Sequence, residues 1–345
     1  MNKVNWGIIG LGNIAQKFLE GFSEVENARI LGLSSRSKEK LEKFRDRFKI
    51  ENKFCFNNYE DLINCKEIDI VYISLPNSLH YEWILKCLDK DKKVLVEKPV
   101  TINFAQLEQI EKKNKKKIFF AEAFMYRFSP QIKLITDLIK NDEIGDLMSL
   151  ESSFGINLLN KKKLFFFKKK KKIDINGRLF NPSLGGGCIL DLGCYPVSFS
   201  ILLSKIISNI KFNNSTNIHL NNIKKEYYQT GVDIDSHLEL RIQNLFTSKI
   251  KASFKENYGN SSIIRGKKGS ILIDDTWINC KKVTIIKNKK KIVNQINYAK
   301  NIYSYEIENV SKTILKKKNY IEFPAMSFDE SKLNMKILDE WINAK

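Results

Sequence analysis

The chain opens with Val4-Asn5-Trp6-Gly7-Ile8-Ile9-Gly10-Leu11-Gly12-Asn13-Ile14-Ala15, and this stretch decides the fold. A short apolar run ends in glycines and helical spacing follows, so the predicted order is strand, turn, helix. In the turn pattern G-x-G-x-x-A, the first glycine permits the tight turn and the second lets the backbone approach a pyrophosphate. The small third residue allows the helix to pack closely on the strand. The candidate dinucleotide-binding residues are therefore Gly10, Gly12, Asn13, Ile14 and Ala15.

Strands and helices then alternate as far as Ala121. Strands are predicted at Ala28–Leu33, Ile68–Ser74, Lys93–Val96 and Lys117–Ala121, and helices at Ile14–Phe22, Lys38–Phe48, Tyr59–Cys65, Tyr81–Leu88 and Asn103–Lys113. This alternation predicts an α/β fold, with a doubly wound parallel sheet of the Rossmann type over residues 1–122. It also favours a nucleotide-binding loop over a bare packing turn at the opening glycines.

After Ala121 the alternation stops. Helices are predicted at Pro130–Lys140, Gly187–Leu203, Ser304–Lys316 and Ser327–Trp341, and strands at Asp146–Ile156, Ser236–Gln243, Ser248–Phe254, Gly269–Ile273 and Lys282–Ile286. We therefore predict an α+β domain over residues 123–345, built on a large mixed or antiparallel sheet. Its segment Lys161–Lys172 holds three phenylalanines between lysine runs, for which a surface loop, a lid over the site and a dimer contact are alternatives.

The composition argues against several classes of protein. Six cysteines without a C-x-x-C pair and three well-separated histidines indicate reduced thiols and no metal site. The net charge of +20 comes mostly from lysines spread along the chain, without a nucleic-acid motif. A solvated surface that favours anionic ligands is therefore preferred over a nucleic-acid partner. The absence of a long apolar run and of a cleavage pattern predicts a cytoplasmic protein with no membrane partner.

The end of the second predicted strand bears on the choice of dinucleotide. NAD-binding sheets usually place a carboxylate there, about 20 residues after the glycines, to bind the ribose hydroxyls. This chain has Ser34-Ser35-Arg36-Ser37 instead. Without the carboxylate a 2′-phosphate is not repelled, and Ser35 and Arg36 offer donors for it. NADP(H) is therefore favoured, and NAD(H) is the alternative cofactor. The alternative role for Arg36 is that of a surface residue that stacks on adenine or faces solvent.

Two further strand ends provide candidates at the carboxyl edge of the sheet, where ligands bind in such folds. Leu75-Pro76-Asn77-Ser78-Leu79-His80 follows one strand. Its Pro76, Asn77 and His80 could line the nicotinamide ribose, or the segment could be a capping loop with a locally bonded histidine. Glu97-Lys98-Pro99 follows the next strand, and Lys98 points either along the hydride-transfer crevice or into a surface salt bridge. Arg127, after Glu122-Ala123-Phe124-Met125-Tyr126, contacts either a ligand or a carboxylate such as Glu122.

The segment Gly185-Gly186-Gly187-Cys188-Ile189-Leu190-Asp191-Leu192-Gly193-Cys194-Tyr195 is the second dense motif. Its glycines allow close backbone approach. If a helix follows, Asp191 and Tyr195 share one face, where a carboxylate and a phenol can bind neighbouring hydroxyls and move a proton. Pro196 would interrupt or kink that helix. A capping Asp191 and a Tyr195 packed on the core are the structural alternative.

Taken together, these blocks resemble the Gfo/Idh/MocA oxidoreductases, in particular the dimeric dihydrodiol dehydrogenase and NADP-dependent xylose dehydrogenase branch. The resemblance implies that Lys98 is the active-site lysine, that Tyr195 stands where many relatives have histidine, and that Asp191 binds or orients a sugar. It also implies an open sheet in the second domain that mediates homodimers or homotetramers. Ser129, where relatives often carry histidine, and the Lys161–Lys172 segment depart from the pattern and leave the substrate open.

The resemblance predicts hydride transfer between NAD(P) and a sugar-like polyol or its carbonyl form, such as an aldose or anhydro-sugar. During oxidation Tyr195 would accept the hydroxyl proton. Because free tyrosine has a pKa near 10, the Lys98 ammonium would be needed to stabilise the phenolate. Lys98 itself is the alternative acid/base. A regulator that binds NAD(P) without turnover is the alternative function, and a nucleic-acid binder is a third hypothesis.

Overall fold

A computed structural model describes residues 2–161, 169–208, 211–213 and 215–344. The chain divides into two compact units. Unit 1 comprises Met1–Thr101, Ala105–Ser129 and Tyr298–Phe328, and unit 2 comprises Ile102–Phe104, Pro130–Asn297 and Asp329–Lys345. Each unit has its own sheet and its own buried core.

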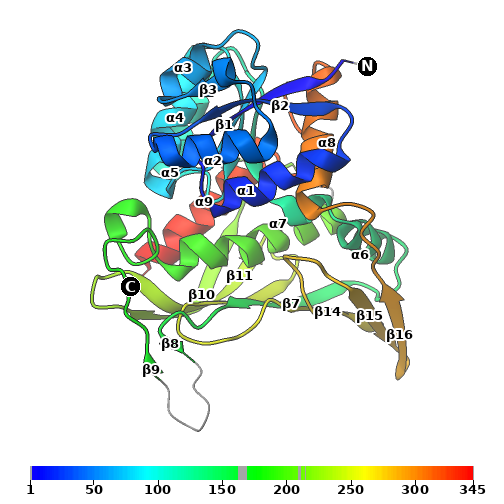
Figure 1. The fold of residues 1–345 in the computed structure, drawn as a ribbon. Coiled ribbons are helices and arrows are strands. Elements are labelled where there is room, and N and C mark those ends of the chain that lie inside the picture. Colours follow the sequence, from blue (N-terminus) through cyan, green and yellow to red (C-terminus); the bar gives the residue numbers. More distant parts are fainter. Residues whose placement is uncertain (1, 162–168, 209–210, 214, 345) are drawn as a thin grey trace. The chain divides into compact units, whose positions relative to one another are not determined.

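Unit 1 is built on a parallel sheet of six strands in the order β3-β2-β1-β4-β5-β6 (Figure 1). The strands are β1 Val4–Ile9, β2 Ala28–Ser34, β3 Cys55–Phe56, β4 Ile70–Ile73, β5 Lys93–Glu97 and β6 Phe120–Ala123. Strand order reverses next to β1, so the carboxyl ends of β1 and β4 flank the crevice in which doubly wound sheets bind their ligands. All four side chains of β4 are buried, as expected of a strand covered on both faces.

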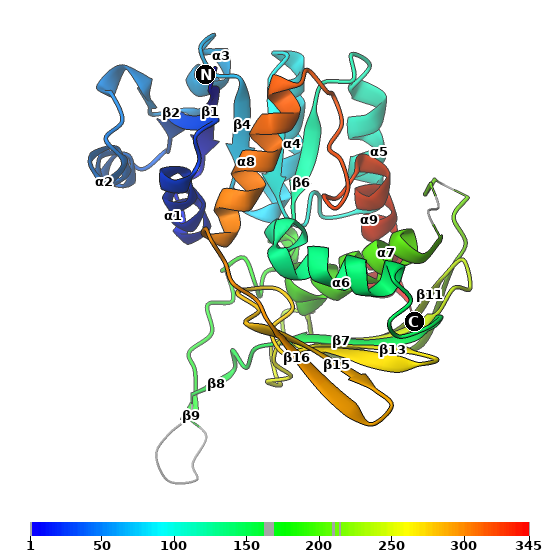
Figure 2. The ribbon, with the colours of Figure 1, turned by 90° about the vertical axis from the view of Figure 1, so that its right-hand side faces the viewer.

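The helices of unit 1 are α1 Asn13–Glu20, α2 Lys38–Phe48, α3 Tyr59–Asn64, α4 Asn77–Asp89, α5 Phe104–Lys113 and α8 Ile302–Leu315. Helix α8 comes from far along the chain and lies against β1, β2 and α1 (Figure 2). Two hydrogen bonds hold α8 in this position. Trp6 Nε1 donates to Ser311 Oγ over 3.0 Å, and Ser304 Oγ donates to Gly21 O over 2.9 Å. Residues near position 300 thus complete a core begun by the N-terminus.

Unit 2 contains an eight-stranded sheet in the order β10-β11-β12-β7-β13-β14-β15-β16. The strands are β7 Leu147–Gly155, β10 Ile218–Tyr227, β11 Asp233–Ile242, β12 Thr247–Ser253, β13 Ser262–Gly266, β14 Gly269–Ile273, β15 Lys282–Lys287 and β16 Lys290–Gln295. Only the β12–β7 pair among these neighbours is parallel. The predicted combination of a parallel Rossmann-type sheet and a large mixed sheet is therefore confirmed.

Helices α6 Pro130–Lys140, α7 Cys194–Ser208 and α9 Phe328–Asn343 accompany the sheet of unit 2. Helices α6 and α7 contact strands of one face (Figures 1 and 2). Within the described chain, one stretch, Pro182–Ser208, is apolar and long enough to cross a membrane, although no such run was expected from the sequence. Because 89% of its most apolar window is buried, we interpret it as a core helix.

Some predicted elements have different limits. The capping loop considered as an alternative for Leu75–His80 is not a loop throughout, because α4 begins at Asn77 with Pro76 at its N-cap. Pro196 does not interrupt its helix, since a π-helical turn at Ile189–Gly193 leads directly into α7. Strands β3, β10, β13 and β16 and the short pair β8 Asn160–Lys161 and β9 Lys169–Lys170 were not predicted. The central residues 162–168 of the lysine and phenylalanine segment lie outside the described residues.

Candidate active site

The glycine turn between β1 and α1 has the geometry of a phosphate-binding loop. Gly10 has a φ of +87°, and a Cβ there would lie 2.9 Å from Ser74 O, so only glycine fits without strain. Ser74 Oγ donates to Gly10 O over 2.7 Å. Gly12 is the N-cap of α1 and has no side chain to cap the helix. A Cβ on Gly12 would meet none of the described atoms within 4 Å, which leaves room for an anion at the helix N-terminus.

A pocket of about 280 Å³ adjoins this turn. Its lining comes from the ends of β1, β2 and β4 and from α2 and α3: Gly10, Leu11, Gly12, Ser35, Arg36, Ser37, Lys40, Tyr59, Ser74, Leu75 and Pro76. The exposed Arg36 guanidinium lies 6.0 Å from the centre of the Tyr59 ring. Ser35 Oγ accepts from Ser37 N over 3.1 Å. Lys40 and Tyr59 were not among the predicted residues, although Lys40 follows Arg36 at helical spacing.

These residues fit a dinucleotide that carries an additional phosphate. The space in front of Gly12 and the N-terminus of α1 suit a pyrophosphate. At the end of β2 the pocket offers two cations, Arg36 and Lys40, together with serine hydroxyls. Cationic donors of this kind bind phosphate strongly. The pocket lining contains no carboxylate among the described residues, so nothing in it would repel a 2′-phosphate.

The Glu97-Lys98-Pro99 turn follows β5 and is held by polar contacts inside unit 1. The Tyr72 hydroxyl on β4 donates to Glu97 Oε1. Val100 N donates to Glu122 Oε1, a buried carboxyl on β6, over 2.9 Å. Lys98 is half-buried at this strand end. The turn is thus fixed by its neighbouring strands, and Lys98 stands at the carboxyl edge of the sheet.

His80 connects this turn with the segment after β4. Its ring is fully buried in α4, with Nδ1 2.9 Å from Pro99 O and Nε2 2.9 Å from Leu75 O. The locally bonded histidine of the structural alternative is therefore observed. Of the other residues predicted near here, Asn77 is buried in the first turn of α4. Arg127 is fully buried in η3 Met125–Phe128, where its Nη1 donates to Pro324 O over 3.5 Å.

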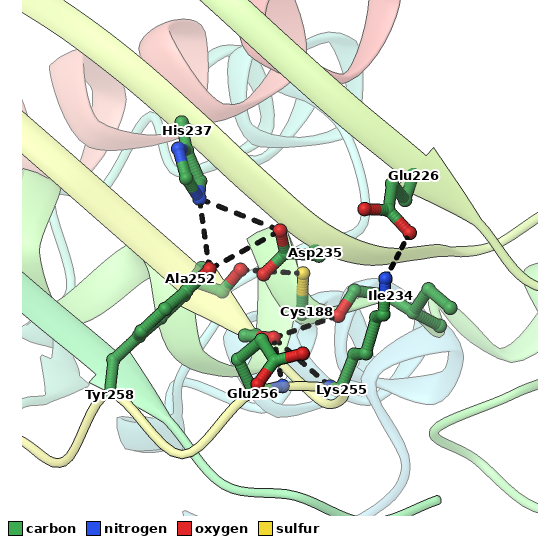
Figure 3. A network of polar contacts seen from close by, with 10 residues as sticks. Cys188, Glu226, Ile234, Asp235, His237, Ala252, Lys255, Glu256 and Tyr258 are labelled. Atoms are coloured by element: carbon green, nitrogen blue, oxygen red, sulfur yellow. Dashed lines mark hydrogen bonds and ion pairs between the residues drawn. The ribbon is translucent and has the colours of Figure 1, made fainter.

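In unit 2, the G-G-G-C segment is fastened to strand β11. Gly187 has a φ of +112°, and a Cβ there would lie 2.3 Å from Asp233 Oδ1. The other oxygen of Asp233 accepts from Ile189 N over 2.7 Å. Cys188 Sγ donates to Ala252 O on β12 over 3.2 Å (Figure 3). Asp233 therefore sets the start of the helical segment that carries Asp191 and Tyr195, a role for which the sequence offers no local signal.

A second group of polar contacts involves β11 residues Asp235 and His237 (Figure 3). The Tyr258 hydroxyl lies 3.1 Å from His237 Nε2 and 3.4 Å from Asp235 Oδ2. Burial lowers the pKa of His237, although Asp235 opposes this effect, so its ring is neutral at pH 7. We interpret the network as hydrogen-bonded support for the strand, not as an ion pair.

Asp191 and Tyr195 occupy different surroundings within unit 2. Asp191, in the π-helical turn, is half-buried and forms an ion pair of 3.0 Å with Arg178 Nη1. Tyr195 is the second residue of α7 and is only 7% exposed. Its ring packs at 5.3 Å from Phe154 and 5.6 Å from Trp277, measured between ring centres. Asp191 is therefore held by a contact with Arg178, and aromatic packing fixes the Tyr195 ring.

The structure thus gathers Gly10, Gly12, Ser35, Arg36 and Pro76 around one pocket. It places Asn13, Ile14 and Ala15 in the first turn of α1. Glu97 and Lys98 lie at the end of β5, and His80, in the first turn of α4, contacts the segments that follow β4 and β5. The described part of the chain has no cluster of three or more histidine, cysteine, aspartate or glutamate side chains arranged to hold a metal ion.

Comparison with known proteins places both units in one family. A family model described as an oxidoreductase family with an NAD-binding Rossmann fold matches residues 4–121. A second model, the GFO/IDH/MocA C-terminal domain, matches residues 132–272. Together the two matches extend over most of both units.

Relatives and a solved structure show the same likeness, two of them over nearly the whole chain and one over about half of it. A trans-1,2-dihydrobenzene-1,2-diol dehydrogenase of Xenopus tropicalis is 28% identical, over 97% of this chain and 96% of that protein. An NADP(+)-dependent D-xylose 1-dehydrogenase of Hypocrea jecorina is 31% identical, over 57% and 52%. The crystal structure of an aldose-aldose oxidoreductase from Caulobacter crescentus superposes with a TM-score of 0.83 at 19% identity, over 99% of this chain and 97% of that one. At that identity the structural likeness concerns the fold alone.

Proposed function

This chain belongs to the Gfo/Idh/MocA oxidoreductase family, and we propose that it transfers a hydride between NADP(H) and a sugar-like polyol or its carbonyl form, such as an aldose or anhydro-sugar. The family makes it an NAD(P)-dependent oxidoreductase. The observation that carries the preference for NADP(H) is the pocket at the end of β2, which contains Arg36 and Lys40 in the absence of a carboxylate among its described lining residues. The named activities of the relatives, on a diol and on xylose, support the substrate class.

Each part of the site has a proposed task. Gly12 and the N-terminus of α1 bind the pyrophosphate, while Arg36 and Lys40 bind the 2′-phosphate. When bound, the nicotinamide supplies or accepts the hydride. Lys98 and Tyr195 are the two candidates for moving the hydroxyl proton. The Asp191 carboxyl group accepts hydrogen bonds from substrate hydroxyls, and its contact with Arg178 helps to orient it.

A turnover screen tests this function directly. Purified protein is assayed with aldoses, anhydro-sugars, inositols and nucleotide sugars, each with NADP(H) and with NAD(H), in both directions. We expect turnover with at least one class of polyol or its carbonyl form, and a higher kcat/KM with NADP(H). Cofactor binding without turnover on the whole panel would contradict the proposal and favour a regulator that binds NAD(P).

The preference for NADP(H) predicts a selective effect of Arg36→Ala. Loss of one charge-assisted contact to the 2′-phosphate costs about 1.5–3 kcal/mol, so the KM for NADP should rise roughly 10- to 100-fold. The KM for NAD, which lacks this phosphate, should change little. Arg45→Ala is the matched control, because Arg45 lies on α2 but pairs with Asp46 and does not line the pocket. Equal small effects of Arg36→Ala on both cofactors would remove Arg36 from the specificity site.

We further propose that unit 2 assembles a homodimer or homotetramer through the sheet face opposite α6 and α7. Charges alternate across neighbouring strands there, since Glu239 and Glu151 both lie opposite Lys249 in register. Arg265 also pairs with Glu151 over 3.4 Å. Alternating charges of this kind complement a second copy related by a twofold axis.

Light scattering should give two or four times the chain mass of 40.1 kDa, and Glu151→Arg should lower the mass measured in solution. A wild-type mass of one chain at micromolar concentration would contradict assembly.

A further inference from the structure

A cluster of two carboxyl groups and two phenols lies in unit 1, next to the Glu97-Lys98-Pro99 turn, and all its members except the half-buried Glu97 are buried. Tyr72 comes from β4 and Glu97 from the end of β5, while Tyr303 and Glu306 come from α8. The Tyr72 hydroxyl donates to Glu97 Oε1. The Tyr72 ring is fully buried and stacks on Phe18 of α1, with 3.7 Å between ring centres. Stacked aromatic rings thus form part of the surroundings of this cluster.

Glu306 is the unexplained member of this cluster. Its residue is only 1% exposed, and neither carboxyl oxygen has a hydrogen-bond partner among the described residues. Burial raises the pKa of Glu306 well above its usual range, and the Glu97 carboxylate raises it further. Ionising a carboxyl group in such surroundings is opposed by a large desolvation free energy, so the protonated acid is the stable form.

The groups next to Glu306 do not counteract the rise of its pKa. Burial and the charge of Glu97 raise the pKa of both Tyr72 and Tyr303, so the phenols stay neutral. On the segments packed against α8, Arg127 directs its Nη1 to Pro324 O, 3.5 Å away. Glu24 of the 3-10 turn Gly21–Glu24 accepts from Ser304 Oγ over 2.7 Å. None of these contacts gives Glu306 a cationic partner within the described residues.

We propose that Glu306 is a positioning residue: it remains a neutral carboxylic acid in the folded protein, so that Glu97 alone carries the negative charge of the cluster. Tyr72 then holds Glu97 in place, one residue before Lys98. A second negative charge on Glu306 would repel Glu97 and disturb the turn that presents Lys98. The part that concerns Lys98 rests on the proposed function, whereas the protonation state of Glu306 does not.

The proposal fixes the sign of a pH dependence. A carboxyl group whose folded pKa is raised contributes stability that is fully present below its unfolded pKa, near 4.5, and is lost as the pH rises toward the folded value. Over that window the folded protein holds one proton that the unfolded chain releases. The unfolding equilibrium constant of the wild type should therefore rise about tenfold per pH unit relative to a variant without this proton.

The first measurement is urea unfolding of the full chain between pH 5 and 8. Glu306→Gln keeps the shape and stays neutral, and Glu306→Met is a second neutral variant in case the buried amide is poorly tolerated. Glu308→Gln is the matched control, because Glu308 lies on the same helix and pairs with Lys300 over 3.0 Å while 39% exposed. We expect the unfolding free energy of the Glu306 variants to increase with pH relative to that of the wild type. The difference between Glu308→Gln and the wild type should stay constant over the same range. Parallel curves for all variants would show that Glu306 is ionised in the folded protein and would overturn the proposal.

The second measurement is the pH profile of turnover, which a merely structural role would not change. The difference in unfolding free energy between the wild type and Glu306→Gln stops growing at the pH at which Glu306 ionises in the folded protein. Below that pH the two pH profiles of turnover should have the same shape. Above it only the wild type should lose activity. A decline shared by Glu306→Gln, or one that begins elsewhere, overturns the positioning role. A wild type without any turnover would contradict the proposed function instead, while the unfolding curves still decide the state of Glu306.

Discussion

Replacing Lys98 with methionine is expected to abolish the chemical step while NADP(H) binding stays nearly intact. Lys98 is half-buried at the end of β5, on the edge of the sheet where ligands bind. Methionine keeps an unbranched stem of the same length, with sulfur in place of one methylene, and lacks the ammonium group. The phosphates are proposed to bind at Gly12, Arg36 and Lys40 instead. Loss of an acid/base group typically lowers the rate by about 10²- to 10⁴-fold, so single-turnover rates should fall by that factor.

Fluorescence titration of the cofactor separates binding from chemistry in this variant. Lys93→Met is the matched control, because Lys93 begins the same strand and lies at its opposite end. It should bind cofactor and turn over as the wild type does. Near-normal turnover of Lys98→Met would remove Lys98 from the mechanism. A large loss of NADP(H) affinity would make it an anchoring residue for the cofactor.

Much of the fold could be predicted because its strongest signals are local. Helix α2 at Lys38–Phe48 and helix α6 at Pro130–Lys140 have their predicted limits, because both show apolar periodicity and each has a local start signal, the N-cap Ser37 for α2 and Pro130 for α6. Strands β10 and β16 were missed for a physical reason. They are the two edges of their sheet and expose many side chains, so their sequences are polar and lack a buried stripe.

In the candidate site too, the features with a local sequence pattern could be predicted and those that depend on distant contacts could not. The glycine turn and the Ser35-Arg36 strand end are local patterns, and the structure brings them to one pocket. Contacts between residues distant in sequence leave no such pattern. Asp233 accepts from Ile189 N across 44 residues. Glu306 reaches the Glu97 cluster only because α8 returns to unit 1. Neither partner could be inferred without the folded arrangement.

Tyr195→Phe is expected to lower turnover about 100-fold or more while the protein remains folded. The ring packs between Phe154 and Trp277, and phenylalanine preserves those contacts while deleting only the hydroxyl. If that hydroxyl accepts the substrate proton, the loss falls mainly on kcat. Tyr228→Phe is the matched control, since Tyr228 also packs edge-on to an aromatic ring of unit 2, at 5.1 Å from Phe180. It should leave kcat unchanged.

The pH dependence identifies the proton acceptor. In the wild type the rate of oxidation should rise with pH as the accepting group loses its proton, because only the deprotonated form can act as the base. That ionisation should be absent from the profile of Tyr195→Phe. The comparison requires conditions in which chemistry limits turnover, which a deuterium isotope effect on the hydride step establishes. Should Tyr195→Phe keep most of its rate with an unchanged profile, Tyr195 only packs against the substrate, and Lys98 or water carries the proton.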